Sequence, residues 1–171
     1  MFTRRQFLKV GASGALLLST ARAGRAHAGS EATRRQPLGR GAREVIAAIV
    51  PVMLAGALPA DQLARASRIA ATVDGVDGAV AALPPHAQAD LQDLFTLLEF
   101  APTRWMLAGL SRPWNEASAG EIAAFLSQWR TSTWSLKQQA YRALHDLVIG
   151  SFYAEPASWP PIGYPGPPKL G

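Results

Sequence analysis

The sequence predicts an all-α protein, an irregular bundle of about five helices followed by an extended Pro-rich C-terminal tail. Three observations support this fold class. Beyond position 42 apolar residues recur at spacings of three and four, no stretch alternates apolar and polar residues with a period of two, and Pro and Gly separate the helical segments. The bundle is expected to be one domain over residues 43–154, with the Pro/Gly-rich tail over residues 155–171.

The first expected helix covers residues 42–58, and its uncharged apolar run is typical of a buried core helix. Pro51 should kink it, because a proline ring removes one backbone hydrogen bond. Asp61 is expected to cap or open a second, Ala-rich helix. That helix should fade around residues 74–78, where the sequence is DGVDG, and resume briefly to Leu83.

A third helix is expected over residues 86–100, after a pair of prolines. Its apolar positions form one face and are Leu91, Leu94, Phe95 and Leu98. After a further proline, residues 103–110 should add another turn or two. Trp105 and Leu107 are expected to face inward there, with Trp105 packing in the core.

Ser118 and Glu121 match a capping box ahead of an apolar run, which predicts the start of a fourth helix. The core positions expected on this helix are Ile122, Phe125, Leu126 and Trp129. A fifth helix is expected over residues 136–153. Its apolar face consists of Tyr141, Leu144, Val148 and Phe152.

The tail combines many Pro and Gly residues with large apolar side chains that a solvated linker would not need. Because Pro restricts the backbone before any binding event, such a tail loses little entropy on docking. Two interpretations stay open: the tail folds back over its own bundle, or it lies as an arm on another protein. Trp114, in a loop beside a proline, is likewise either a core residue or a partner contact. The residues predicted to bind a partner are Trp114, Trp159, Ile162, Tyr164 and Pro165.

The basic character of the chain belongs to its first 28 residues. The net charge is +5 and the isoelectric point about 10.2. Residues 1–28 contain five Lys and Arg and no Asp or Glu, which leaves twelve basic and twelve acidic residues in the remainder. We therefore expect no nucleic-acid binding by the mature domain, since that requires a basic surface.

Residues 1–28 have the pattern of a twin-arginine (Tat) export signal. The residues that carry this signal are Arg4, Arg5, Phe7, Leu8 and Lys9. The apolar run that follows is too short to span a bilayer, and Ala26 and Ala28 give the small-x-small pattern of a signal-peptidase site. Residues 29–42 repeat TRRQ before a proline and are interpreted as a flexible basic linker. The mature protein is therefore expected in the periplasm.

Residues that could carry chemistry are sparse. There is no Cys, and only His86 and His145 lie outside the leader. Neither a metal-ligand cluster nor a nucleotide-binding or hydrolase motif is present in the sequence. The chain is therefore not expected to be an enzyme or to hold a metal or cofactor of its own.

Several motifs together resemble a known family. They are the Tat leader, SQWRTS at 127–132, FYAEPASW at 152–159 and IGYPGPP at 162–168, the last being the most specific. With these motifs the chain is similar to the small (gamma) subunit family of gluconate dehydrogenase-type enzymes, and the likeness covers roughly residues 43–168. The Ala/Gly-rich stretch at 74–82 and the basic segment at 34–43 depart from the family pattern.

The resemblance implies a non-catalytic accessory subunit. Its partner would be a flavoprotein of the glucose–methanol–choline (GMC) type that holds FAD, oxidises a sugar or alcohol, and is exported folded on the small subunit's Tat leader. A multihaem cytochrome c often accepts the electrons, and the complex can be membrane-associated. The Tat translocase would be a further partner. The alternative from the residues alone is a stand-alone periplasmic helical protein that binds a small ligand or metal.

Overall fold

The computed structural model describes residues 38–167, and in this part of the chain all regular structure is helical, which confirms the all-α class. The α-helices are α2 (Arg40–Met53), α3 (Gln62–Ala81), α4 (Pro85–Glu99), α5 (Ala101–Ala108), α6 (Ala119–Arg130) and α7 (Ser135–Ala154). Short 3-10 turns are η1 (Trp114–Glu116), η2 (Pro156–Ser158) and η3 (Pro160–Ile162). The described residues contain one more α-helix than expected, because α5 is a separate helix.

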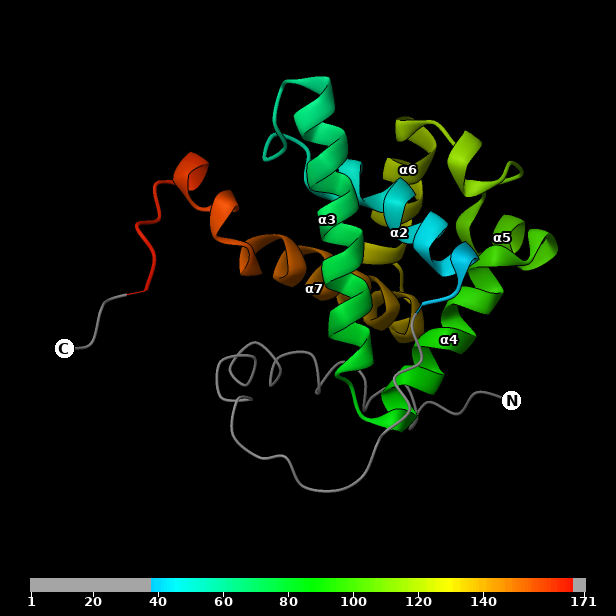
Figure 1. Ribbon diagram of the computed structural model, residues 1–171. Coiled ribbons are helices and arrows are strands. Elements are labelled where there is room, and N and C mark those ends of the chain that lie inside the picture. The colour runs from blue at the N-terminus through cyan, green and yellow to red at the C-terminus, as the bar shows by residue number, and fades with distance from the viewer. Residues whose placement is uncertain (1–37, 168–171) are drawn as a thin grey trace.

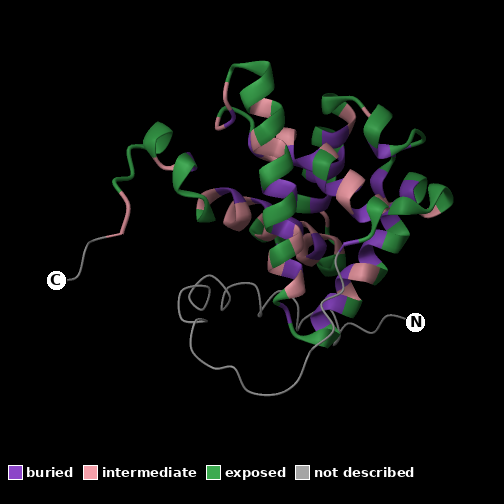
Figure 2. Cartoon of the chain, viewed as in Figure 1, coloured by how far each residue is buried: buried purple, intermediate pink, exposed green. Residues whose placement is uncertain are grey.

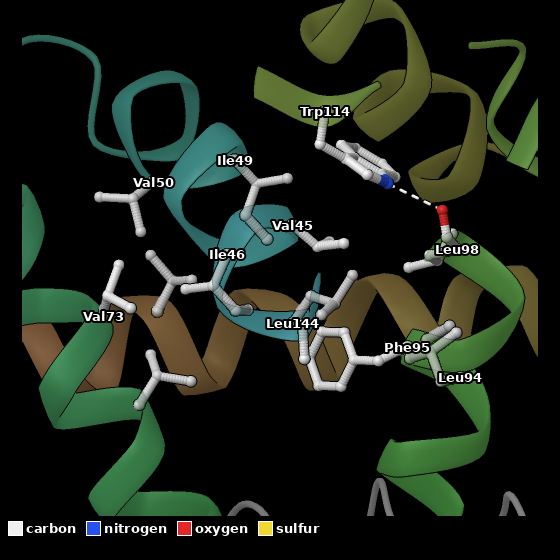
Figure 3. Close-up of a cluster of buried hydrophobic side chains, with 14 of the residues drawn as sticks. Val45, Ile46, Ile49, Val50, Val73, Leu94, Phe95, Leu98, Trp114 and Leu144 are labelled. Atoms are coloured by element: carbon white, nitrogen blue, oxygen red, sulfur yellow. Dashed lines mark hydrogen bonds between the residues drawn. The ribbon is translucent and has the colours of Figure 1, made fainter. Parts of the chain in front are cut away.

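Helix α2 is the central helix of the bundle, and α3, α4, α6 and α7 pack around it (Figure 1). Its core side chains are completely buried and meet residues of α3, α4 and α7 (Figure 3). They are Val45, Ile46, Ile49 and Val50. Burial of an apolar side chain of this size contributes about 1.5–3 kcal/mol, so α2 is a main source of the bundle's stability. The expectation of a buried core helix is confirmed.

The expected end of this helix was wrong. Helix α2 ends at Met53, not at residue 58, and Pro51 lies in its last turn. Gly56 then adopts a left-handed conformation with φ of 87°. Because Pro51 has no N–H to donate and Gly56 permits a turn that other residues disfavour, the chain leaves the helix here.

Helix α3 is continuous from Gln62 to Ala81, so the expected interruption at residues 74–78 was also wrong. Its N-cap is Asp61, as predicted, whose carboxylate accepts from the N–H of Ala64 at 2.8 Å. The glycines stay helical in the part of α3 that holds its buried residues, and this helix packs against α2 and α7. A Cβ at Gly75 would lie 3.1 Å from the Cβ of Ser151 in α7, so glycine allows the close approach of the two helices.

The predicted apolar face of α4 is buried, and the capping box that begins α6 is present. The side chain of Ser118 accepts from the N–H of Glu121, and the Glu121 carboxylate accepts from the N–H of Ser118 at 2.8 Å. The core positions predicted for α6 are all buried. On α7, Leu144, Val148 and Phe152 are buried and Tyr141 is partly buried.

Buried residues gather where the helices face one another, whereas the segment after α7 is mostly exposed (Figure 2). Within residues 38–167 no helix combines the length and the apolar character needed to cross a membrane. The residues predicted to form the export signal and its cleavage site lie outside the described residues. The same holds for most of the expected linker.

Candidate docking arm

Residues 155–167, here named the arm, continue past the end of α7 and away from the other helices (Figure 1). The chain leaves α7 at Glu155, whose backbone is extended, and forms the two 3-10 turns η2 and η3. The hydroxyl of Ser158 donates to the carbonyl of Glu155 at 2.7 Å and closes the first turn. Of the two interpretations of the tail, packing on its own bundle is seen at the start of the arm, where η2 contacts the end of α7 and Ser158 is buried, whereas residues 160–165 are exposed.

Trp159 stabilises the folded conformation of the arm. Its indole Nε1–H donates to the carbonyl of Tyr153, in the last turn of α7, at 2.9 Å. The ring of Tyr164 packs edge-on against it, with the ring centroids 5.3 Å apart. Gly166 lies against the same indole, where a Cβ would be 3.1 Å from Trp159 Cζ3. Trp159 is therefore half-buried within its own chain and acts as the internal support of the arm.

Ile162, Tyr164 and Pro165 are the residues that the arm presents outward. Ile162 is 54% exposed and Tyr164 is 45% exposed, and Pro165 is exposed as well. Gly163 between them has φ of 69°, a left-handed conformation that favours glycine and turns the chain so that both apolar side chains remain on the surface. The sequence predicted that these three residues and Trp159 all bind a partner. In the structure Trp159 packs within its own chain, and Ile162, Tyr164 and Pro165 are exposed.

Trp114 lies inside the bundle, so the expectation that it binds a partner is corrected. It is buried, and its indole Nε1–H donates to the carbonyl of Leu98 at 2.8 Å (Figure 3). Its ring meets Phe125 edge-on at a centroid distance of 5.4 Å. The physical reason is the break between α4 and α5, where Pro102 cannot donate to Leu98 and the indole takes its place.

Side chains elsewhere also satisfy carbonyls at helix ends. Trp129 donates from Nε1 to the carbonyl of Leu107, at the end of α5, at 2.8 Å. Arg104 is only 7% exposed, and its guanidinium donates to the carbonyl of Glu99, at the end of α4, at 3.0 Å. A cation at a helix C-terminus is favoured by the helix dipole, which offsets part of the cost of burying this Arg.

Sequence reasoning missed the largest exposed apolar side chains. Trp105 was expected in the core, yet it is 66% exposed, as are Met106 beside it and Trp134 before α7. The expected inward position of Trp105 is therefore wrong. A signal was available in the spacing, because Arg104 and Ala108 share one side of α5 and Trp105 lies on another. Recognising it required the knowledge that Arg104 is turned inward.

Other polar contacts of the described residues join the start of α2 to α3 or lie on the surface. Asp77 accepts from the N–H of Leu38 at 2.6 Å and, with Asp74, pairs with Arg43, which joins the start of α2 to α3. His145 Nδ1 lies 3.1 Å from a carboxylate oxygen of the neighbouring Asp146, on an exposed surface. Among residues 38–167, no three metal-ligating side chains gather into a site.

Within residues 38–167, two carboxyl groups have shifted pKa values, and each shift has a local structural cause. Hydrogen bonds from the N–H and the hydroxyl of Ser118 lower the pKa of Glu121. Partial burial, and secondarily the charge of Glu44, raises the pKa of Glu99. The first shift follows from the helix cap. The second follows from packing between α4 and the start of α2.

The chain was compared with family models, with curated proteins and with solved structures. No family model, no curated protein and no solved structure matches it.

Proposed function

We propose that this chain is the non-catalytic small subunit of a periplasmic, FAD-dependent dehydrogenase complex of the GMC type. It carries the Tat export signal for the complex. It also stabilises the flavoprotein subunit, which holds the FAD and oxidises a sugar or alcohol. The observation that carries this proposal is the arm, which leaves the bundle and keeps Ile162 and Tyr164 exposed on a folded support. The family resemblance of the same segment supplies the kind of partner.

The arm has the physical properties of a recognition segment. Its prolines and the Trp159 support order it before binding, so less conformational entropy is lost when it docks. An isoleucine and a tyrosine beside prolines suit an apolar, aromatic-lined groove on the partner, the surface that recognises Pro-rich segments in other systems. Binding of the folded small subunit would then raise the stability of the flavoprotein by mass action.

The first experiment tests the arm. Ile162→Ser with Tyr164→Ser should abolish co-purification of a yellow flavoprotein from the native periplasm, because both exposed contacts are lost. Far-UV circular dichroism should remain unchanged, since neither side chain belongs to the core. The matched control is Leu63→Ser, another exposed apolar residue, on α3. Equal recovery of flavoprotein by the arm variant and the control would contradict the docking role.

The second experiment tests the export role. Replacing Arg4 and Arg5 by Lys should retain both this chain and the flavoprotein in the cytoplasm, because a partner without its own signal depends on this one. Activity in separated cell fractions measures the outcome, and a Sec-exported periplasmic protein serves as control. If the flavoprotein still reaches the periplasm, the escort role is wrong. Recovery of the wild-type chain alone and colourless would instead favour the stand-alone binding protein.

A further inference from the structure

Trp159 lies between the bundle and the exposed part of the arm. The chain leaves α7 at Ala154 and passes through η2 before Trp159 and through η3 after it. The first turn, η2, packs on the end of α7, whereas residues 160–165 are all exposed. Among the described residues, no hydrogen bond or ion pair joins this exposed segment directly to an α-helix. Its position therefore depends on the residue that connects it to η2.

The indole of Trp159 connects this residue to α7. Its Nε1–H donates to the carbonyl of Tyr153 at 2.9 Å. Tyr153 is in the last turn of α7, where carbonyls lack a backbone donor within the helix. The backbone N–H of Trp159 donates to the carbonyl of Pro156 at 3.1 Å, within η2. Trp159 is thus joined both to the helix end and to the turn that packs on it.

The carbonyl and the ring of the same residue hold the exposed segment. The carbonyl of Trp159 accepts from the N–H of Ile162 at 3.1 Å and from the N–H of Tyr164 at 3.2 Å. The ring packs edge-on against that of Tyr164, and Gly166 lies against its other atoms. Both apolar side chains that the arm presents outward therefore belong to residues whose backbone is bound to Trp159.

These contacts differ in what their loss would change. The carbonyl and ring contacts lie within the arm and maintain its shape. The hydroxyl of Ser158, which is buried, donates within η2 and maintains the turn below. The indole N–H is the contact that joins Trp159 to the helix itself. Removing this donor alone should therefore leave the arm and η2 folded but allow the segment from Trp159 onward to change its direction relative to α7.

We propose that Trp159 is a positioning residue, which fixes the direction in which the arm presents Ile162 and Tyr164. A fixed direction reduces the conformational entropy that is lost when both side chains enter their sites on a partner. Trp159 then acts on docking through these two residues, not through a contact of its own. The claim about direction stands by itself, whereas the claim about docking rests on the proposed function.

The direction of the arm can be measured without a partner. The chain has no Cys, so two introduced thiols can be spin-labelled selectively. In the full chain carrying Ile162→Cys and Ala71→Cys, double electron–electron resonance measures the distance from the arm to an exposed position on α3. Because α3 crosses α7, this distance changes when the arm changes direction (Figure 1). We expect a distribution with a single narrow maximum.

Adding Trp159→Phe to the labelled chain keeps an aromatic ring against Tyr164 but removes the donor. The distance distribution should then lose its narrow maximum, while far-UV circular dichroism stays unchanged. The matched control is Trp105→Phe, the same substitution at an exposed indole on α5, which should leave the distribution narrow. Equal widths for the two variants, a broad distribution in the parent chain, or a loss of helicity with Trp159→Phe would each overturn the positioning role.

The effect on docking is measured with Ile162 and Tyr164 intact. Trp159→Phe should weaken binding to the flavoprotein that co-purifies with the parent chain by about tenfold, because the arm must then be ordered on docking. Weaker binding with an unchanged distance distribution would overturn the proposal, since the indole would then contact the flavoprotein itself. Failure of the parent chain to recover any flavoprotein would refute the subunit function and leave the distance result unaffected.

Discussion

The hydrogen bond from Trp114 to Leu98 should contribute strongly to the free energy of unfolding, and Trp114→Phe tests it. In an unbroken helix the carbonyl of Leu98 would accept from the N–H of residue 102. Residue 102 is Pro and has none, and Nε1–H of Trp114 donates instead at 2.8 Å in a buried setting. Phe retains an aromatic ring at this position but removes the donor.

The magnitude follows from two contributions. Leaving the buried carbonyl unsatisfied costs about 1–3 kcal/mol. The smaller ring also leaves a cavity and loosens the edge-on contact with Phe125, 5.4 Å away between ring centroids. We expect a total loss of about 2–4 kcal/mol in the free energy of unfolding. At about 4 °C per kcal/mol for a domain of this size, Tm should fall by about 8–16 °C.

Thermal and urea unfolding followed by far-UV circular dichroism measure this loss. The matched control is Trp105→Phe, the same substitution at an exposed indole, which should change the unfolding free energy by less than about 0.5 kcal/mol. A similar Tm for the two variants would refute the reasoning. It would mean that the indole donor contributes nothing beyond its apolar ring.

Three other perturbations have defined outcomes. Gly78→Ala, where an added Cβ meets open space, should stabilise the protein by about 0.5–1 kcal/mol in urea unfolding, whereas Gly75→Ala should gain less, because its Cβ would lie 3.1 Å from that of Ser151; equal gains would contradict the close packing of α3 on α7. Because Ser118 lowers the pKa of Glu121, the carboxylate's contribution to stability is complete above its unfolded-state pKa of about 4.3 and is lost as pH falls through the lower folded-state pKa. In Glu121→Gln the free energy of unfolding should therefore decrease less as the pH is lowered. An unchanged pH dependence would mean that the Ser118–Glu121 cap does not contribute to it. Asp77→Ala removes the acceptor for Leu38 and a partner of Arg43, so amide hydrogen exchange at the start of α2 should accelerate, while Asp93→Ala on α4 should leave it unchanged.

Several features of this fold were predictable because they depend on neighbours in the sequence. The apolar faces of α4, α6 and α7 follow from spacings of three and four, and they are buried as predicted except for Tyr141 of α7, which is partly buried. The caps at Asp61 and Ser118 join residues three positions apart. The apolar composition of α2 likewise predicted its place in the core.

The site residues were only partly predictable. The prolines and the apolar residues of the tail indicated a recognition segment, and Ile162 and Tyr164 are exposed as a docking role requires. The role of Trp159 could not be predicted from the sequence, because it depends on the hydrogen bond that its indole donates to the carbonyl of Tyr153 at the end of α7. Trp114 looked equally suited to a partner, and its burial depends on a carbonyl sixteen residues earlier in the chain.

The sequence by itself determined the helical class, most of the helices and the faces by which they pack, because each of these reflects interactions within a few turns. Only the tertiary structure decided which tryptophans are buried and which are exposed. Each indole can either fill a core or face solvent, and composition does not distinguish the two. The choice follows from which helix-end carbonyls lack a backbone donor. Trp114, Trp129 and Trp159 satisfy such carbonyls, whereas the inward turn of Arg104 leaves Trp105 on the surface.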